Sequence, residues 1–155
     1  MKIETAEFRK VIEEAKGREA KIDPVKLAAL KWHLLLEKDL DTYLSKLIPN
    51  PSYVKIDDMP FRRKGEWALA LSAGNDNDPV WGVFWAINQL RNKIAHEADP
   101  KATEEKMAYL RKVYVAALEP AQRADAEKKS DPEIVQESCW LVMGFLGQLG
   151  LQAGG

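Results

Sequence analysis

The residues of this sequence best suited to chemistry lie in one short string, Arg91-Asn92-Lys93-Ile94-Ala95-His96. An arginine side chain always carries its charge and can bind two phosphate oxygens at once. Histidine has the side-chain pKa nearest neutrality and can pass a proton in either direction. Arg91 and His96 therefore predict chemistry on a phosphodiester. Asn92 can fix the histidine tautomer or help to hold the phosphate.

The spacing of these residues limits how they can act together. Arg91 and His96 are five positions apart, so in a regular helix their side chains point about 140° apart. They can meet at one target if the arginine bends round, if the helix ends near His96, or if two copies of the helix end face each other. The alternative is structural: His96 caps a helix C-terminus, and Arg91 pairs with an acid such as Glu37 or Asp41.

The segment that carries the string has the strongest helical pattern in the chain. It opens at Asp78-Pro79, a cap followed by proline. Its core-facing stripe consists of Val80, Val83, Phe84, Ile87, Leu90 and Ile94. A second line on the same helix consists of Trp81, Trp85, Asn88, Asn92 and His96. This second line predicts either a dimer interface made by Trp81, Trp85 and Asn88 or packing of the two tryptophans within the same chain.

Helical spacing continues through most of the sequence and predicts an all-α, single-domain bundle of about six helices. The first helix carries a stripe of Phe8, Val11, Ile12 and Ala15 and ends near Gly17. The next four are expected at about 24–48, 57–71 with Asp57 or Asp58 as cap, 78–96 and 99–118. A polar stretch over 119–130 is interpreted as a frayed extension or linker, and a last helix follows at 131–149. The domain covers 1–150, and 151–155 form a flexible tail.

Bulk composition points to a globular protein of a reducing compartment. The chain has 155 residues, of which 46% are apolar, enough for one domain with a core. Its 23 basic and 24 acidic residues balance, so RNA could be bound only through a local patch. The single cysteine, Cys139, lies in an apolar segment and is interpreted as a buried, inert thiol. The sequence shows no signal peptide and no apolar run long enough to span a membrane, which favours the cytoplasm.

The remaining polar residues give weaker signals. Arg62-Arg63-Lys64 is the best candidate for an RNA-contacting patch, and the alternative is a solvated charged face. Lys93 would join the patch, and a ribonuclease should gather Arg62, Arg63, Arg91 and Lys93 around one cleft. His33 follows a tryptophan in an apolar helix and is interpreted as a packed or surface histidine. No spacing indicates a metal site, and no motif indicates a cofactor.

The string Leu90-Arg91-Asn92-Lys93-Ile94-Ala95-His96-Glu97 resembles the signature of the HEPN superfamily, the higher eukaryotes and prokaryotes nucleotide-binding domains. That family carries arginine, a polar residue and a later histidine at the end of a helix in an all-α bundle. The acidic-apolar helix around 35–44 also resembles the family, and the likeness covers roughly 24–114. The same string and helical pattern are similar to the mannitol operon repressor group.

The resemblance implies two functions. The first is a metal-independent endoribonuclease of the toxin or defence type, acting as a homodimer with the motif at the interface and opposed by a cognate antitoxin. In that case Arg91 would hold the scissile phosphate, His96 would be the general acid or base, and Asn92 would position one of them. The alternative is a non-catalytic dimerisation or binding module, or a transcriptional regulator of the mannitol-repressor type.

Overall fold

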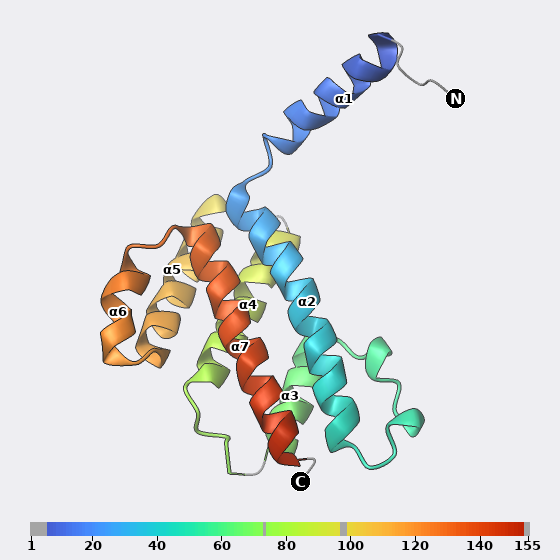
Figure 1. Ribbon diagram of the computed structural model, residues 1–155, viewed down its shortest axis with the longest axis vertical. Helices are drawn as coiled ribbons and strands as arrows, with labels where there is room; N and C mark the ends of the chain where they lie inside the picture. The colour runs from blue at the N-terminus through green and yellow to red at the C-terminus, as the bar shows by residue number, and fades with distance from the viewer. Residues whose placement is uncertain (1–5, 73, 97–98, 154–155) are drawn as a thin grey trace.

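The computed structural model describes residues 6–72, 74–96 and 99–153 (Figure 1). These residues form one all-α bundle without strands, which confirms the predicted fold class. The described elements are α1 (Ala6–Glu19), α2 (Pro24–Leu47), the 3₁₀ helices η1 (Pro51–Tyr53) and η2 (Ile56–Asp58), α3 (Phe61–Leu71), α4 (Val80–Ala95), α5 (Pro100–Ala117), α6 (Pro120–Glu127) and α7 (Asp131–Ala153). The described part thus holds seven α-helices, one more than the sequence indicated.

The long helices α2 and α7 lie side by side along their length and form one face of the bundle (Figure 1). Helix α4 packs against both of them, and α5 covers the other side of α4. Helix α3 lies against the C-terminal half of α2. Helix α1 projects away from the bundle beyond the N-terminal end of α2 (Figure 1). The helix that carries the Arg91–His96 string is therefore the central helix of the bundle.

The Asp-Pro signals mark three helix starts as the sequence predicts. Asp23 Oδ1 accepts a hydrogen bond from the Val25 N–H at 2.8 Å at the start of α2. In the same way, Asp78 Oδ1 accepts a hydrogen bond from the Val80 N–H at 2.9 Å, and Asp99 Oδ1 accepts one from the Lys101 N–H at 3.1 Å. Each aspartate satisfies a helix N–H that has no partner within its helix, and each carries negative charge at the positive end of the helix dipole.

The cap of the last helix is Ser130, one residue before the predicted cap, Asp131. The Ser130 N–H donates to Glu133 Oε2 at 2.8 Å, and the Ser130 hydroxyl donates to the same oxygen at 2.6 Å. These bonds place the glutamate three residues after the cap, as in a capping box. Asp131 lies inside the first turn of α7 instead and binds Arg111 at 2.5 Å.

Two predicted elements differ from the structure. Asp57 and Asp58 do not cap α3, because they belong to η2 and the helix starts at Phe61, after Pro60. The proline follows the irregular segment and keeps the residue before it out of helical geometry. The polar stretch over 119–130 contains a helix of its own, α6, opened by Pro120 at its first position and packed on α5.

The C-terminal helix is longer than predicted. Helix α7 continues past Leu149 to Ala153, so 151–153 are helical and do not form the expected tail, while 154–155 lie outside the described residues. Gly150 is buried there, in contact with α2. By length and composition α7 is also apolar enough to cross a membrane, contrary to the prediction. A core helix passes the same test, and α7 packs against α2, α4 and α5.

An aromatic stack joins α3 to α4 in the middle of the core. The Phe61 and Phe84 rings lie parallel with centroids 4.9 Å apart, and Trp85 meets Phe84 edge to face at 4.8 Å. Gly65 allows this approach, because a Cβ at that position would lie 2.6 Å from Phe84 Cζ. Such a distance is shorter than any normal carbon contact. The two helices can therefore pack this closely only with glycine at position 65.

We predict that Gly65→Ala destabilises the fold by about 2 kcal/mol, because the new methyl group overpacks the Phe84 and Trp85 rings. Gly82→Ala is the matched control, since a Cβ there meets nothing within 4 Å. That change should stabilise the fold by about 1 kcal/mol through the higher helix propensity of alanine. Urea unfolding followed by circular dichroism measures both. Equal effects of the two substitutions would contradict the packing described here.

Candidate functional site

The Arg91–His96 string occupies the last turn of α4. The helix ends at Ala95, and His96 is its C-cap residue, whose N–H donates to the Asn92 carbonyl oxygen at 3.1 Å. Arg91 and Asn92 are half-buried, whereas Lys93 and His96 are exposed. The structure thus meets one of the three conditions set by the spacing, because the regular helix stops at His96. Glu97, the last residue of the resemblance, lies outside the described residues.

Asn92 contacts the arginine rather than the histidine. The Arg91 Nη1 donates to Asn92 Oδ1 at 3.4 Å. Between Asn92 and His96 the described contact is the backbone bond alone, so the predicted side-chain hydrogen bond is not formed in this conformation. The geometry assigns Asn92 to the orientation of the guanidinium group.

The structural alternative for Arg91, a pair with Glu37 or Asp41, is not what the structure shows. Both carboxylates bind Lys64 instead, with Nζ 2.9 Å from Glu37 Oε1 and 2.7 Å from Asp41 Oδ1. No carboxylate of the described ranges lies within ion-pair distance of Arg91. Arg91 therefore keeps a positive charge that no described acid neutralises.

Lys64 is buried, which removes it from the predicted RNA-contacting patch. Its side chain is 2% exposed, although its partners on α2 remain about a quarter exposed. Burial alone lowers the pKa of Lys64, but the bonds to Asp41 and Glu37 outweigh burial and raise the pKa above its usual value. The lysine is therefore a charged, structural residue that ties α3 to α2.

The other cations of the predicted patch are exposed but lie on separate helices. Arg62 and Arg63 stand on the first turn of α3 and both bind Glu66, at 3.0 Å and 3.4 Å. Lys93 is exposed on the last turn of α4. Within the described part of the chain, these groups form no ion pair or hydrogen bond with Arg91. The gathering of all four cations around one cleft stays a prediction.

His33 is a buried neighbour of Arg91 that the sequence did not assign to the site. Its ring packs on Phe61 with centroids 4.1 Å apart, and Nε2 has no hydrogen-bond partner in the described part of the chain. Burial, and then the charges of Arg91 and Lys64, lower the pKa of His33 to about 4 against the opposing effect of Glu37. The imidazole is therefore neutral at pH 7.

The sequence contains a spacing that could have indicated the buried group formed by Lys64 with residues of α2. His33, Glu37 and Asp41 follow each other at intervals of four, so they lie along one line of α2. From the sequence alone, the two acids are considered as possible partners of Arg91. A histidine and two acids in one line, opposite a helix that carries a lysine, is the pattern that could have indicated a buried charged cluster.

The residues predicted for a dimer interface lie mostly inside the chain. Trp81 packs edge to face on Phe145 of α7 with centroids 5.5 Å apart, and its Nε1 donates to the Asn75 carbonyl oxygen at 3.0 Å. Asn88 is buried and Trp85 is half-buried. For Trp81 the structure shows the alternative, packing under a helix of the same chain. In the single chain Trp81 and Asn88 therefore offer little surface to a second copy.

The largest-volume pocket formed by the described residues does not include the Arg91–His96 string. A pocket of about 570 Å³ lies where α2, α5 and the start of α7 meet, and Val25, Met107 and Arg111 are among its lining residues. None of the string residues lines that pocket. Burial raises the pKa of Cys139 to about 12, which is consistent with an inert thiol. In the ranges that the structure describes, no three potential metal ligands come together.

Comparison with known proteins gives no relative of this chain. No family model matches the sequence, no curated protein matches it, and no solved structure matches it. The resemblance to HEPN domains therefore remains a prediction that depends on the Arg91–His96 string and on its place at a helix end.

We predict that Lys64→Met destabilises the fold by about 3 kcal/mol, because Glu37 and Asp41 then face a buried apolar side chain. Arg62→Met, which breaks an exposed pair with Glu66, should change the stability by no more than about 0.5 kcal/mol. Chemical unfolding of both variants measures the difference. A Lys64→Met protein as stable as Arg62→Met would show that the buried cation is dispensable.

We also predict that His33 makes stability depend on pH between 6.5 and about 4. In this window the unfolded chain takes up a proton on His33 and the folded chain does not, so stability falls as the pH falls. The loss should reach at most about 3.5 kcal/mol, at about 1.4 kcal/mol per pKa unit. The stability of His33→Leu, measured by unfolding across the same pH window, should not show this loss. Identical pH profiles of the two proteins would refute the assignment.

Proposed function

We propose that this protein is a HEPN-like, metal-independent endoribonuclease whose site is the Arg91–His96 end of α4. The observation that carries the proposal is the charge of Arg91, which no acid of the described ranges neutralises. The two acids of α2 that could have paired with it, Glu37 and Asp41, are bound to Lys64. An arginine beside an exposed histidine at a helix end can bind an anionic phosphate from solution.

Each residue of the string then has a chemical role. Arg91 binds the oxygens of the scissile phosphate and stabilises the charge that develops on them. Asn92 holds the guanidinium group through its Oδ1. The ribose 2′-oxygen loses its proton and attacks phosphorus, and the bond to the 5′-oxygen breaks. The products are a 2′,3′-cyclic phosphate and a 5′-hydroxyl, and His96 takes up or supplies one of the transferred protons.

His96 suits this role better than the other histidine. It is exposed at the C-cap of α4, whereas His33 is buried and its pKa is lowered to about 4. A proton donor or acceptor must reach the substrate and should titrate near the working pH. The angle of about 140° between positions 91 and 96 of a regular helix favours a site shared with a second copy. A homodimer and a cognate antitoxin belong to the same proposal, as does a cytoplasmic location.

The second candidate is a non-catalytic binding or dimerisation module, as in a regulator of the mannitol-repressor type. The observation that favours it is the half-burial of Arg91 and Asn92 in the last turn of α4. In that case the string would stabilise a helix end or a protein contact, and RNA would remain intact.

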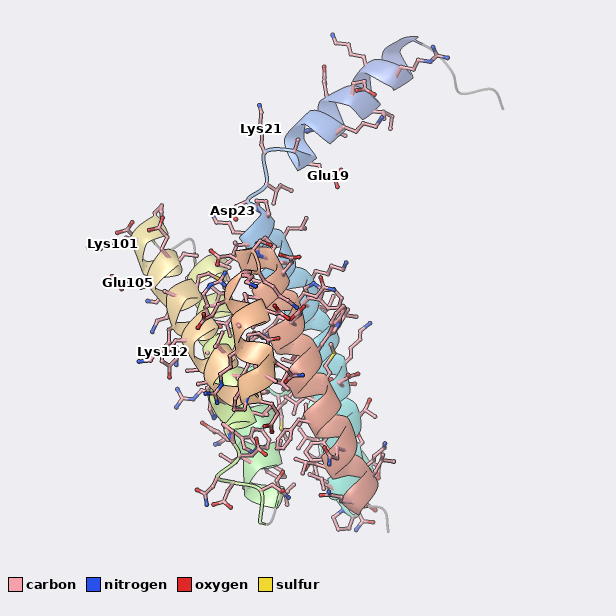
Figure 2. The ribbon with its side chains drawn as sticks, turned by 60° about the vertical axis from the view of Figure 1, so that its left-hand side comes forward. Glu19, Lys21, Asp23, Lys101, Glu105 and Lys112 are labelled. Atoms are coloured by element: carbon pink, nitrogen blue, oxygen red, sulfur yellow. The ribbon has the colours of Figure 1, made fainter. Side chains whose placement is uncertain are left out.

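Incubation of the purified protein with total RNA in the presence of a chelator separates the two candidates. We expect cleavage that leaves cyclic phosphate ends, lowered at least about 100-fold by His96→Ala and by Arg91→Ala. Asn92→Ala should lower it about tenfold, because the guanidinium group stays but loses an orienting partner. Lys112→Ala, which removes an exposed cation of α5 (Figure 2), should cleave like the unaltered protein.

Two results would count against this assignment. Equal cleavage by all the variants would place the activity outside the string or in a contaminant. Absence of cleavage by every protein, with the fold intact by circular dichroism, would favour the binding module.

A further inference from the structure

Three leucines of α2 form an exposed line on the side of the helix that faces away from the core. Leu27, Leu30 and Leu34 follow helical spacing, and they are 48%, 48% and 57% exposed. Single exposed leucines are normal on a protein surface, but a line of three on one helix face is typical of an unfilled contact. We call these three residues the leucine face.

Helix α1 has an apolar stripe that is also uncovered. Val11 and Ile12 are exposed, Ala15 continues the stripe by helical spacing, and every described side chain from position 9 to 19 is exposed. The side chain of Phe8 lies outside the described residues. Figures 1 and 2 show the helix standing clear of all other elements. An isolated amphipathic helix of this length is only marginally stable in water, so α1 needs a partner.

The connection between the two helices directs α1 away from its own leucine face. The N–H groups of Ala20, Lys21 and Ile22 donate to carbonyl oxygens of α1 at 2.9, 3.1 and 3.0 Å. These bonds form turns in the connector that follows α1, where Figure 2 labels Glu19 and Lys21. The chain then enters α2 at the Asp23 cap without a reversal of direction.

We propose that α1 of one copy packs on the leucine face of a second copy, and that the exchange is reciprocal in a two-fold dimer. Charged residues border both surfaces, and on α1 they include Lys16 and Arg18 as well as glutamates. Lys31 and Lys38 each stand one turn after a leucine of the face, at 27 and 34. Glu14 follows Val11, and Glu19 follows Ala15, at the same kind of spacing. The apolar stripe of α1 and the leucine face are thus both apolar lines with charged borders, and Glu14 and Glu19 of one copy can pair with Lys31 and Lys38 of the other.

This inference does not depend on ribonuclease activity, because its evidence is the exposure of α1 and α2. The inferred contact would hold together the two copies that the proposed ribonuclease site requires. Oligomeric state and RNA cleavage are separate measurements, so either proposal can fail while the other stands.

Light scattering on the chromatographed protein tests the dimer. The full chain should have twice its mass of 17.5 kDa at micromolar concentration. Ile12→Glu and Leu34→Glu should each weaken self-association at least about 30-fold, because each puts a charge into both symmetric contacts. Leu151→Glu, at an exposed leucine of α7, is the matched control and should leave the dimer intact. Circular dichroism checks that each variant is folded.

Mixing of the two weakened variants tests the exchange itself. A heterodimer of the Ile12→Glu chain and the Leu34→Glu chain contains one unaltered contact, so the mixture should associate more tightly than either protein alone. A monomeric wild-type protein would overturn the proposal, as would a dimer unaffected by both substitutions. A dimer that is weakened by Leu34→Glu alone, without recovery on mixing, would show that α1 does not occupy the leucine face.

Discussion

The fold depends on one buried charge, the ammonium group of Lys64. A lysine can be buried in a small helical bundle only if carboxylates replace the water that it loses, and Glu37 and Asp41 do so from one line of α2. Two consequences follow from this one interaction. Helix α3 is held against α2, and the two acids are unavailable to Arg91. A residue that is 2% exposed thus binds the two acids of α2 that could otherwise have paired with Arg91.

Apolar packing and the charged cluster act at the same junction. Phe61 contacts His33 on one side and Phe84 on the other, so an aromatic column passes from α2 through α3 to α4. Gly65 lets α3 approach closely enough for that column to form. Because Arg91 lies further along the same helix as Phe84, packing at the column also sets the position of the last turn of α4. The last turn of α4 is therefore held in place by the packing of Phe84 in the core.

Much of the fold could be predicted from the sequence, because helical spacing and Asp-Pro caps are local signals. The boundaries of α2, α4 and α5 agree with those signals within a few residues. Local signals did not predict features that depend on contacts between residues distant in the sequence. Helix α7 continues to Ala153 after its last buried residues, Leu149 and Gly150. Lys64 belongs to a basic run but is buried, because it binds acids that are distant in the sequence. For the site, the sequence located the helix end at His96, but it could not show that Asn92 contacts Arg91 or that His33 lies nearby.

The direction of the helices has a practical consequence for attaching other molecules to this protein. Helix α7 ends at the far end of the bundle from the last turn of α4, since α4 runs up the molecule and α7 runs down it (Figure 1). A fluorescent label or a surface linker placed after α7 would therefore stand away from the Arg91–His96 end and from the N-terminal helix. Immobilisation through the C-terminal end should orient every molecule with its candidate site toward the solution.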